Sequence, residues 1–169
     1  MNSKIETKTA STIELPVDVL EYLSTSPSVF KSISNFEKTR IDFSLTPLEQ
    51  KAVVITVCEA LDAQYWIDFQ MKSALSLGMT LAEILQIRIG LSKEERIEVL
   101  IEITKSIVIN YRKINEQFLH EFISAGYSEI EFLEVISLIN QQKQLIELTY
   151  YWLISNKPLK QNEFLNLNK

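Results

Sequence analysis

The stretch LTPLEQKAVVITVCEALDAQYWIDFQMKSALSLGMTLAEI, residues 45–84, decides the fold of this chain. It contains two capping boxes, at Thr46 and at Thr80, in each of which Glu follows the threonine by three residues. The hydroxyl and the carboxylate of such a box accept hydrogen bonds from backbone N–H groups that would otherwise be unpaired at the start of a helix. Pro47 fits the first helical position, and Gly78 fits the end of the helix before Thr80. The stretch therefore predicts three successive helices joined by tight turns.

The rest of the chain repeats this pattern. Ser92 and Ser128 are each followed three residues later by Glu, and Gly90 and Gly126 stand just before them. Apolar residues recur at helical spacing between these starts, and no segment alternates with the period of two that is typical of a strand. We therefore predict an all-α bundle of about six to eight helices. The expected helices cover approximately residues 16–23, 28–38, 46–61, 62–77, 80–89, 92–110, 115–125 and 128–155.

Length and hydropathy indicate one domain. The chain has 169 residues and a mass of 19.5 kDa, close to the common size of a single domain. Apolar residues make up 46% of it, which is enough for one hydrophobic core. We expect a disordered tail over residues 1–14, a single helical domain over residues 15–160 and a second tail over residues 161–169.

Charge and the rare residue types exclude several classes of function. There are 17 Lys and Arg against 22 Asp and Glu, so the net charge is −5 and no nucleic-acid partner is expected. The single Cys and the single His argue against a disulfide and against a Cys- or His-based metal site, and we expect neither a metal nor a cofactor. The unbroken apolar runs are far shorter than the ~20 residues that span a bilayer. The polar N-terminus has no apolar run of the kind found in a secretory signal. We therefore expect a cytoplasmic protein that does not associate with membranes.

The order of these elements resembles the alkylhydroperoxidase D-like, or carboxymuconolactone decarboxylase, family. Its members carry Leu-Ser/Thr-Pro-x-Glu before an apolar helix, then a helix with the active residues, then Gly-Leu-Ser/Thr with a Glu three residues past the cap. Residues 45–84 follow this order, and ISAGYSEIEFLEVISLIN, residues 123–140, matches the family's final Ala-Gly-aromatic-Ser-x-x-Glu helix. The resemblance covers about residues 28–155. It implies a helical bundle, a homo-oligomer that is a trimer or a hexamer, and an antioxidant peroxidase or decarboxylase activity.

The residues of that redox activity are all replaced in this chain. The resemblance implies Cys-x-x-Cys-x-x-x-His on the second helix, with a relay Glu on the helix before it. Aligned on Thr-Pro, Tyr and Gly, the two Cys positions are Ala63 and Trp66, the His position is Gln70 and the relay position is Lys51. The only cysteine, Cys58, lies five residues before Ala63. We therefore expect no catalytic residue at these family positions and no redox activity.

A second branch of the family lacks the cysteines and often carries Tyr-Glu-Trp-x-x-His at this place. This chain has Tyr65 but neither the acid nor the His. Two functional hypotheses follow. In the first, the chain is a redox-inactive assembly or ligand-binding protein. In the second, it is an enzyme that acts on a small carbonyl or carboxylate compound with a rebuilt site around Lys51, Tyr65, Asp68 and Gln70.

The candidate ligand-binding residues are Lys51, Tyr65, Trp66 and Gln70, and two of them have open alternatives. Lys51 is either a solvated lysine in the first turns of a helix or part of a small pocket that binds an anionic or carbonyl ligand. Trp66 either plugs the space of the lost cysteine or forms the aromatic wall of a surviving pocket.

Three further features complete the sequence-based predictions. Cys58 lies among apolar residues, so a buried and inert thiol is expected. His120 lies among glutamates and is expected on the surface. The segment 148–154 is apolar nearly all round, which is typical of a central helix or of a subunit interface, and it favours the homo-oligomer.

Overall fold

The computed structural model describes residues 14–110 and 116–155, and this part of the chain is all-α, with no strand. The prediction of an all-α bundle of about six to eight helices is confirmed. The expected tails over residues 1–14 and 161–169 lie outside the described residues, apart from Glu14. The helices are α1 (Val17–Ser24), α2 (Pro27–Thr39), a short 3-10 turn η1 (Arg40–Asp42), α3 (Pro47–Ala60), α4 (Gln64–Ser76), α5 (Leu81–Arg88), α6 (Glu95–Ile109), α7 (Glu116–Ser124) and α8 (Glu129–Ser155).

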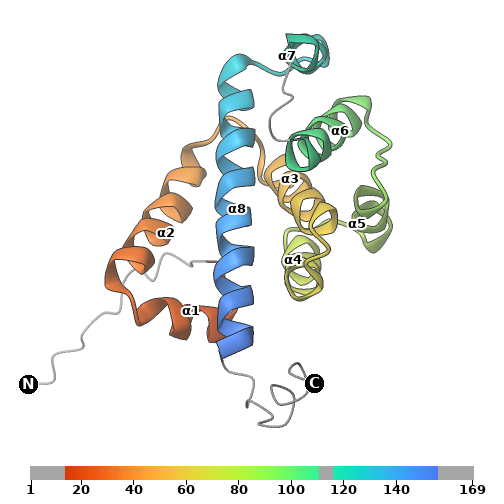
Figure 1. Ribbon diagram of the computed structural model, residues 1–169. Helices are drawn as coiled ribbons and strands as arrows, with labels where there is room; N and C mark the ends of the chain where they lie inside the picture. The colour runs from red at the N-terminus through yellow and green to blue at the C-terminus, as the bar shows by residue number, and fades with distance from the viewer. Residues whose placement is uncertain (1–13, 111–115, 156–169) are drawn as a thin grey trace, which may run out of the picture.

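Helix α3 is the centre of the bundle. It contacts α4, α5, α6 and α8, and every residue from 49 to 58 is buried. Figure 1 shows the long α8 in the middle of the view, with α1 and α2 on one side of it and α3 to α6 on the other. None of the described helices is both long and apolar enough to cross a membrane.

Three of the four predicted capping boxes form. Thr46, Thr80 and Ser128 each accept a hydrogen bond from the N–H of the Glu three residues later, and each Glu carboxylate accepts the N–H of its cap residue. The fourth box does not form at Ser92: the cap of α6 is Glu94, two residues later, and the helix begins at Glu95. The hydroxyl of Ser92 accepts the N–H of Glu94, and the N–H of Ser92 is bound by Glu98 from the next turn. These two hydrogen bonds place Ser92 in a turn that precedes the helix.

The helix ends follow the glycines as predicted. Gly78, Gly90 and Gly126 have φ values of 93°, 87° and 91°, in the left-handed region that a side chain disfavours. At Gly78 a Cβ would meet no atom within 4 Å, so backbone conformation rather than crowding accounts for the glycine there.

Arg96 of α6 joins two of the capping boxes to each other. Its guanidinium donates to Glu49 at 3.0 Å, to Glu131 at 3.0 Å and to the carbonyl of Gly126 at 3.0 Å. It also lies over the ring of Tyr127, 3.9 Å from the centroid. The starts of α3 and α8 are thereby held to α6 by one planar cation, which can bind two carboxylates at once.

Candidate functional site

Lys51 of α3 is a buried cation with three hydrogen-bond partners. Its side chain is only 1% exposed, and the described residues around it provide one acceptor for each ammonium proton. Nζ donates to Oε1 of Gln70 at 2.8 Å, to the hydroxyl of Ser73 at 2.6 Å and to the carboxylate of Glu14 at 3.1 Å. We call these four residues the Lys51 cluster.

Three parts of the chain build this cluster. Lys51 lies in the second turn of α3, and α4 packs against that helix. Gln70 and Ser73 are three residues apart on α4, so they share the face that meets α3. Glu14 comes from the segment before α1 and is 39% exposed, which makes it the most accessible member. Two partners of Lys51 are therefore fixed in the core, and the third reaches it from the surface.

Burial sets the electrostatics of the cluster. It lowers the pKa of the Lys51 ammonium, because the charged form is disfavoured away from water, and the neighbouring Glu14 carboxylate opposes this effect. A buried charge requires a counter-charge and a full set of hydrogen bonds, and Glu14, Gln70 and Ser73 provide them.

A pocket of about 360 Å³ opens beside Lys51. The described residues that line it combine charged and amide side chains with apolar ones from the η1 turn and the start of α3. Arg40 donates to Glu37 at 3.2 Å and to Gln50 at 3.1 Å. Burial raises the pKa of Glu37, although the charge of Arg40 opposes this shift. The charged and amide residues that line it are Glu14, Glu37, Arg40, Gln50 and Lys51, and the hydroxyl residues are Ser44 and Thr46.

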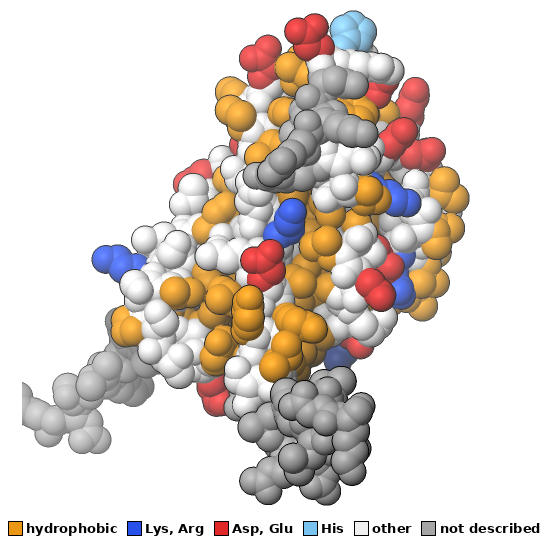
Figure 2. Space-filling model, in the orientation of Figure 1, with side chains coloured by type: hydrophobic (Ala, Val, Ile, Leu, Met, Phe, Trp, Pro, Cys, Tyr) orange, Lys and Arg blue, Asp and Glu red, His pale blue; other side chains and the backbone are white. Residues whose placement is uncertain are grey.

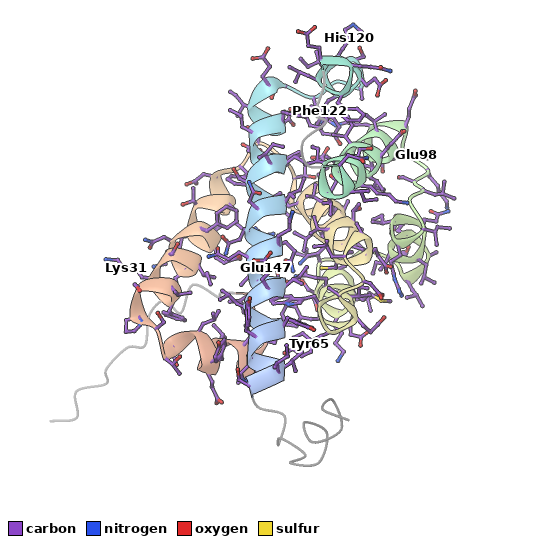
Figure 3. All side chains as sticks on the ribbon, viewed as in Figure 1. Lys31, Tyr65, Glu98, His120, Phe122 and Glu147 are labelled. Atoms are coloured by element: carbon purple, nitrogen blue, oxygen red, sulfur yellow. The ribbon has the colours of Figure 1, made fainter. Side chains whose placement is uncertain are left out.

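The structure divides the four residues expected to bind a ligand into two pairs, Lys51 with Gln70 and Tyr65 with Trp66. Lys51 and Gln70 share a hydrogen bond, whereas the hydroxyl of Tyr65 donates to Asp18 at 2.6 Å. Asp68 is exposed and accepts a hydrogen bond from Gln64. Figure 3 places the labelled Tyr65 at the start of α4, beside α8. Of the four residues of the rebuilt site, Lys51 and Gln70 are therefore in contact, whereas Tyr65 and Asp68 bind other partners.

Trp66 fills the space between α4 and α8. Its indole is 1% exposed and donates to the hydroxyl of Thr149 at 3.2 Å. Its ring also contacts those of Tyr65 and Phe69 edge to face. This burial agrees with the interpretation of Trp66 as a plug. An edge of Trp66 also lines a separate pocket of about 190 Å³, together with Ala63, Tyr65 and residues of α8.

Cys58 and His120 lie apart from the cluster. Cys58 is fully buried, and burial raises the pKa of its thiol to about 12. His120 is exposed on α7, and Figure 3 shows it at the opposite end of the molecule from Tyr65. Within residues 14–110 and 116–155, no three His, Cys, Asp or Glu side chains lie close enough to hold a metal ion.

Several residues of the Lys51 cluster and of the pocket beside it were missed from the sequence. Ser73 carries a usable signal, because it lies one turn beyond Gln70 on the same face of α4. No sequence signal identifies Glu14, Glu37 or Arg40, since a loop and the packing of α2 bring them to Lys51.

Comparison with protein-family models finds no match, and comparison with curated proteins finds none either. The resemblance to the alkylhydroperoxidase D-like family rests on the residues of this chain alone and stays a prediction.

Proposed function

We propose that this protein is a redox-inactive relative of the alkylhydroperoxidase D-like enzymes that binds a small carboxylate beside Lys51. The observation that carries the proposal is the pair of Lys51 and Glu14, in which a buried ammonium holds a surface carboxylate at the edge of a pocket of about 360 Å³. Pockets for small ligands commonly have volumes of roughly 300–1,000 Å³.

The position of Glu14 marks where a ligand carboxylate would bind. Gln70 and Ser73 hold two protons of the Lys51 ammonium from within the core, and Glu14 accepts the third from the side of the pocket. A ligand that displaces Glu14 would replace its hydrogen bond and its charge without disturbing the other two. Charge-assisted hydrogen bonds of this kind are stronger than neutral ones.

The same cluster supports the resemblance. The relay acid and the active His of the family correspond to Lys51 and Gln70, and these two side chains are in direct contact at 2.8 Å. A lysine and an amide in place of an acid and an imidazole would retain binding and lose proton transfer, since Gln does not titrate.

The alternative function is an enzyme acting on a small carbonyl or carboxylate compound. The lowered pKa of Lys51 favours it, because a neutral amine is the nucleophile that attacks a carbonyl. Two observations favour binding instead. Tyr65 and Asp68 lie outside the Lys51 cluster, and all three protons of the ammonium are already donated.

We further propose that the protein is a homo-oligomer, a trimer or a hexamer, as the resemblance implies. The apolar end of α8 supports this, because Tyr150, Tyr151 and Ile154 are 63%, 65% and 51% exposed. Large apolar side chains in water favour association when a second surface covers them.

Removal of the internal carboxylate tests the binding proposal. Glu14→Ala leaves the Lys51 ammonium without its counter-charge, so we expect a lower thermal midpoint than in the unmodified protein. Added benzoate should restore it, because a ligand at a hundred times its Kd stabilises the folded state by about 2.7 kcal/mol. Glu21→Ala, at an exposed glutamate of α1, is the matched control.

The comparison among the three proteins decides the outcome. The proposal predicts that benzoate raises the midpoint of Glu14→Ala more than those of the unmodified protein and Glu21→Ala. Equal shifts in all three, or no shift in Glu14→Ala, would contradict it.

A further inference from the structure

The charged side chains of the pocket beside Lys51 form two ion pairs. Among the described residues that line the pocket, Glu14 is paired with Lys51 at 3.1 Å, and Glu37 is paired with Arg40 at 3.2 Å. Their charges therefore balance within the pocket. A simple carboxylate that takes the place of Glu14 on Lys51 leaves the Glu14 carboxylate without its counter-charge.

A displaced Glu14 remains near the pocket. The next residue, Leu15, is 7% exposed and belongs to the hydrophobic core, which holds the backbone of Glu14 in place. Burial, opposed by the charge of Arg40, raises the pKa of Glu37, and the charge of Glu14 adds to the increase. The Glu14 and Glu37 carboxylates are therefore close enough to repel each other.

Glu37 has unused capacity to accept hydrogen bonds. Its side chain is 9% exposed, and both of its oxygens accept from a single nitrogen, Nη1 of Arg40, at 3.3 and 3.2 Å. Arg40 is its one donor among the described residues, whereas an ionised carboxylate has about four lone-pair sites. Once Glu14 has released Lys51, two carboxylates that are only partly satisfied lie beside the pocket. An ammonium, with three donors and a positive charge, fits between them.

The charge of the whole protein favours a ligand that carries its own cation. The chain has a net charge of −5, and Figure 2 shows acidic side chains gathered at the end of the molecule that carries α7. A field of this sign disfavours an added negative charge. A zwitterion adds none, and its positive group neutralises the carboxylate that its negative group has displaced.

We propose that the ligand is an α-amino acid with an apolar side chain. This inference rests on the proposed binding of a carboxylate at Lys51 and names the class of that ligand. The ligand carboxylate accepts from Lys51 in place of Glu14, and the ligand ammonium donates to Glu14 and Glu37. Because the Glu14 carboxylate lies 3.1 Å from Nζ of Lys51, an ammonium on the carbon next to the ligand carboxylate is within its reach.

The apolar part of the pocket suits the ligand side chain. Leu45 is buried, whereas Ile41 and Leu77 are exposed, so the apolar lining runs from the core to the rim. A volume of about 360 Å³ has room for an apolar side chain beside the two charged groups. The apolar lining residues are Ile41, Phe43, Leu45, Pro47 and Leu77.

A matched pair of ligands isolates the ammonium. L-phenylalanine and 3-phenylpropionate share the carboxylate and the aromatic side chain and differ only in the amino group. Calorimetric titration of the unmodified protein should give L-phenylalanine a Kd at least about tenfold lower, because hydrogen bonds between charged groups are strong. Equal Kd values, or tighter binding of 3-phenylpropionate, would overturn the amino-acid inference and leave the carboxylate site standing. If neither compound binds, the carboxylate site is wrong and the inference fails with it.

Two variants test where the ammonium binds. Glu14→Gln and Glu37→Gln keep the side-chain size and remove one carboxylate each, and Glu21→Gln, at an exposed glutamate of α1, is the control. The preference for L-phenylalanine should persist in the control and fall below about threefold in the other two. Both ligands share the contact with Lys51, so the ratio of their Kd values cancels a general change in the pocket. An unchanged ratio in both variants would overturn this placement. The comparison of ligands on the unmodified protein tests the proposal even where a substitution prevents folding.

Discussion

At the scale of single residues, Lys51 determines the chemistry of the candidate site. The sequence is consistent with either a solvated Lys51 or a Lys51 that lines a pocket. In the structure its side chain is only 1% exposed, because other helices pack around α3. Its contact with Gln70 follows from two positions singled out in the sequence. Its contact with Glu14 depends on a segment 37 residues earlier in the chain, which no local pattern predicts.

Cys58 gives the prediction that belongs to this scale. Only the thiolate reacts with peroxides, and a thiol with a pKa of about 12 in the core is neither ionised nor accessible at neutral pH. We expect no hydroperoxide turnover by the unmodified protein, and the same absence in Cys58→Ala. Iodoacetamide should label Cys58 only after unfolding. Robust turnover that disappears in Cys58→Ser would contradict this prediction and assign chemistry to the lone thiol.

At the scale of helices, the sequence predicts most of the fold because its signals are local. Capping boxes and left-handed glycines act over a few residues, so the three boxes at Thr46, Thr80 and Ser128 form as expected. The prediction fails at Ser92, where Glu98 competes for its N–H from one turn further on. At Ser128 the glutamate at the same offset, Glu134, accepts the N–H groups of Ser44 and Leu45 instead, and the box forms.

The bridge made by Arg96 gives the prediction at this scale. Arg96→Lys should destabilise the protein almost as much as Arg96→Met, by about 1–3 kcal/mol in urea unfolding, because an ammonium cannot bind Glu49 and Glu131 in one plane. Arg88→Lys is the control: its ion pair involves a single carboxylate, that of Glu59, so the loss should be smaller. Equal stability of Arg96→Lys and the unmodified protein would argue against the bridge.

The pH dependence of this effect follows from Glu49. Burial raises its pKa, but the hydrogen bonds from Thr46 and the charge of Arg96 outweigh burial, so the pKa lies below the usual 4.5. A lowered carboxyl pKa contributes stability above 4.5 that is lost as the pH falls through the folded-state value. The difference between the unmodified protein and Arg96→Met should therefore shrink in that acidic range.

At the scale of the whole molecule, the site depends on contacts between distant segments. The pocket joins the segment before α1, the end of α2, the η1 turn and α3, and tertiary packing alone brings these together. Helix periodicity predicts which face of each helix is buried, but not which helix lies opposite. For this reason the sequence predicts the helix boundaries to within a few residues. Of the candidate site, it predicts only Lys51 and Gln70.

The position of a bound carboxylate tests the central claim most directly. A crystal structure of the unmodified protein grown with benzoate should have a benzoate oxygen at about 2.7–3.2 Å from Nζ of Lys51, with Glu14 displaced toward solvent and the bonds to Gln70 and Ser73 retained. An intact pair of Lys51 and Glu14, with benzoate bound elsewhere or absent, would contradict the account.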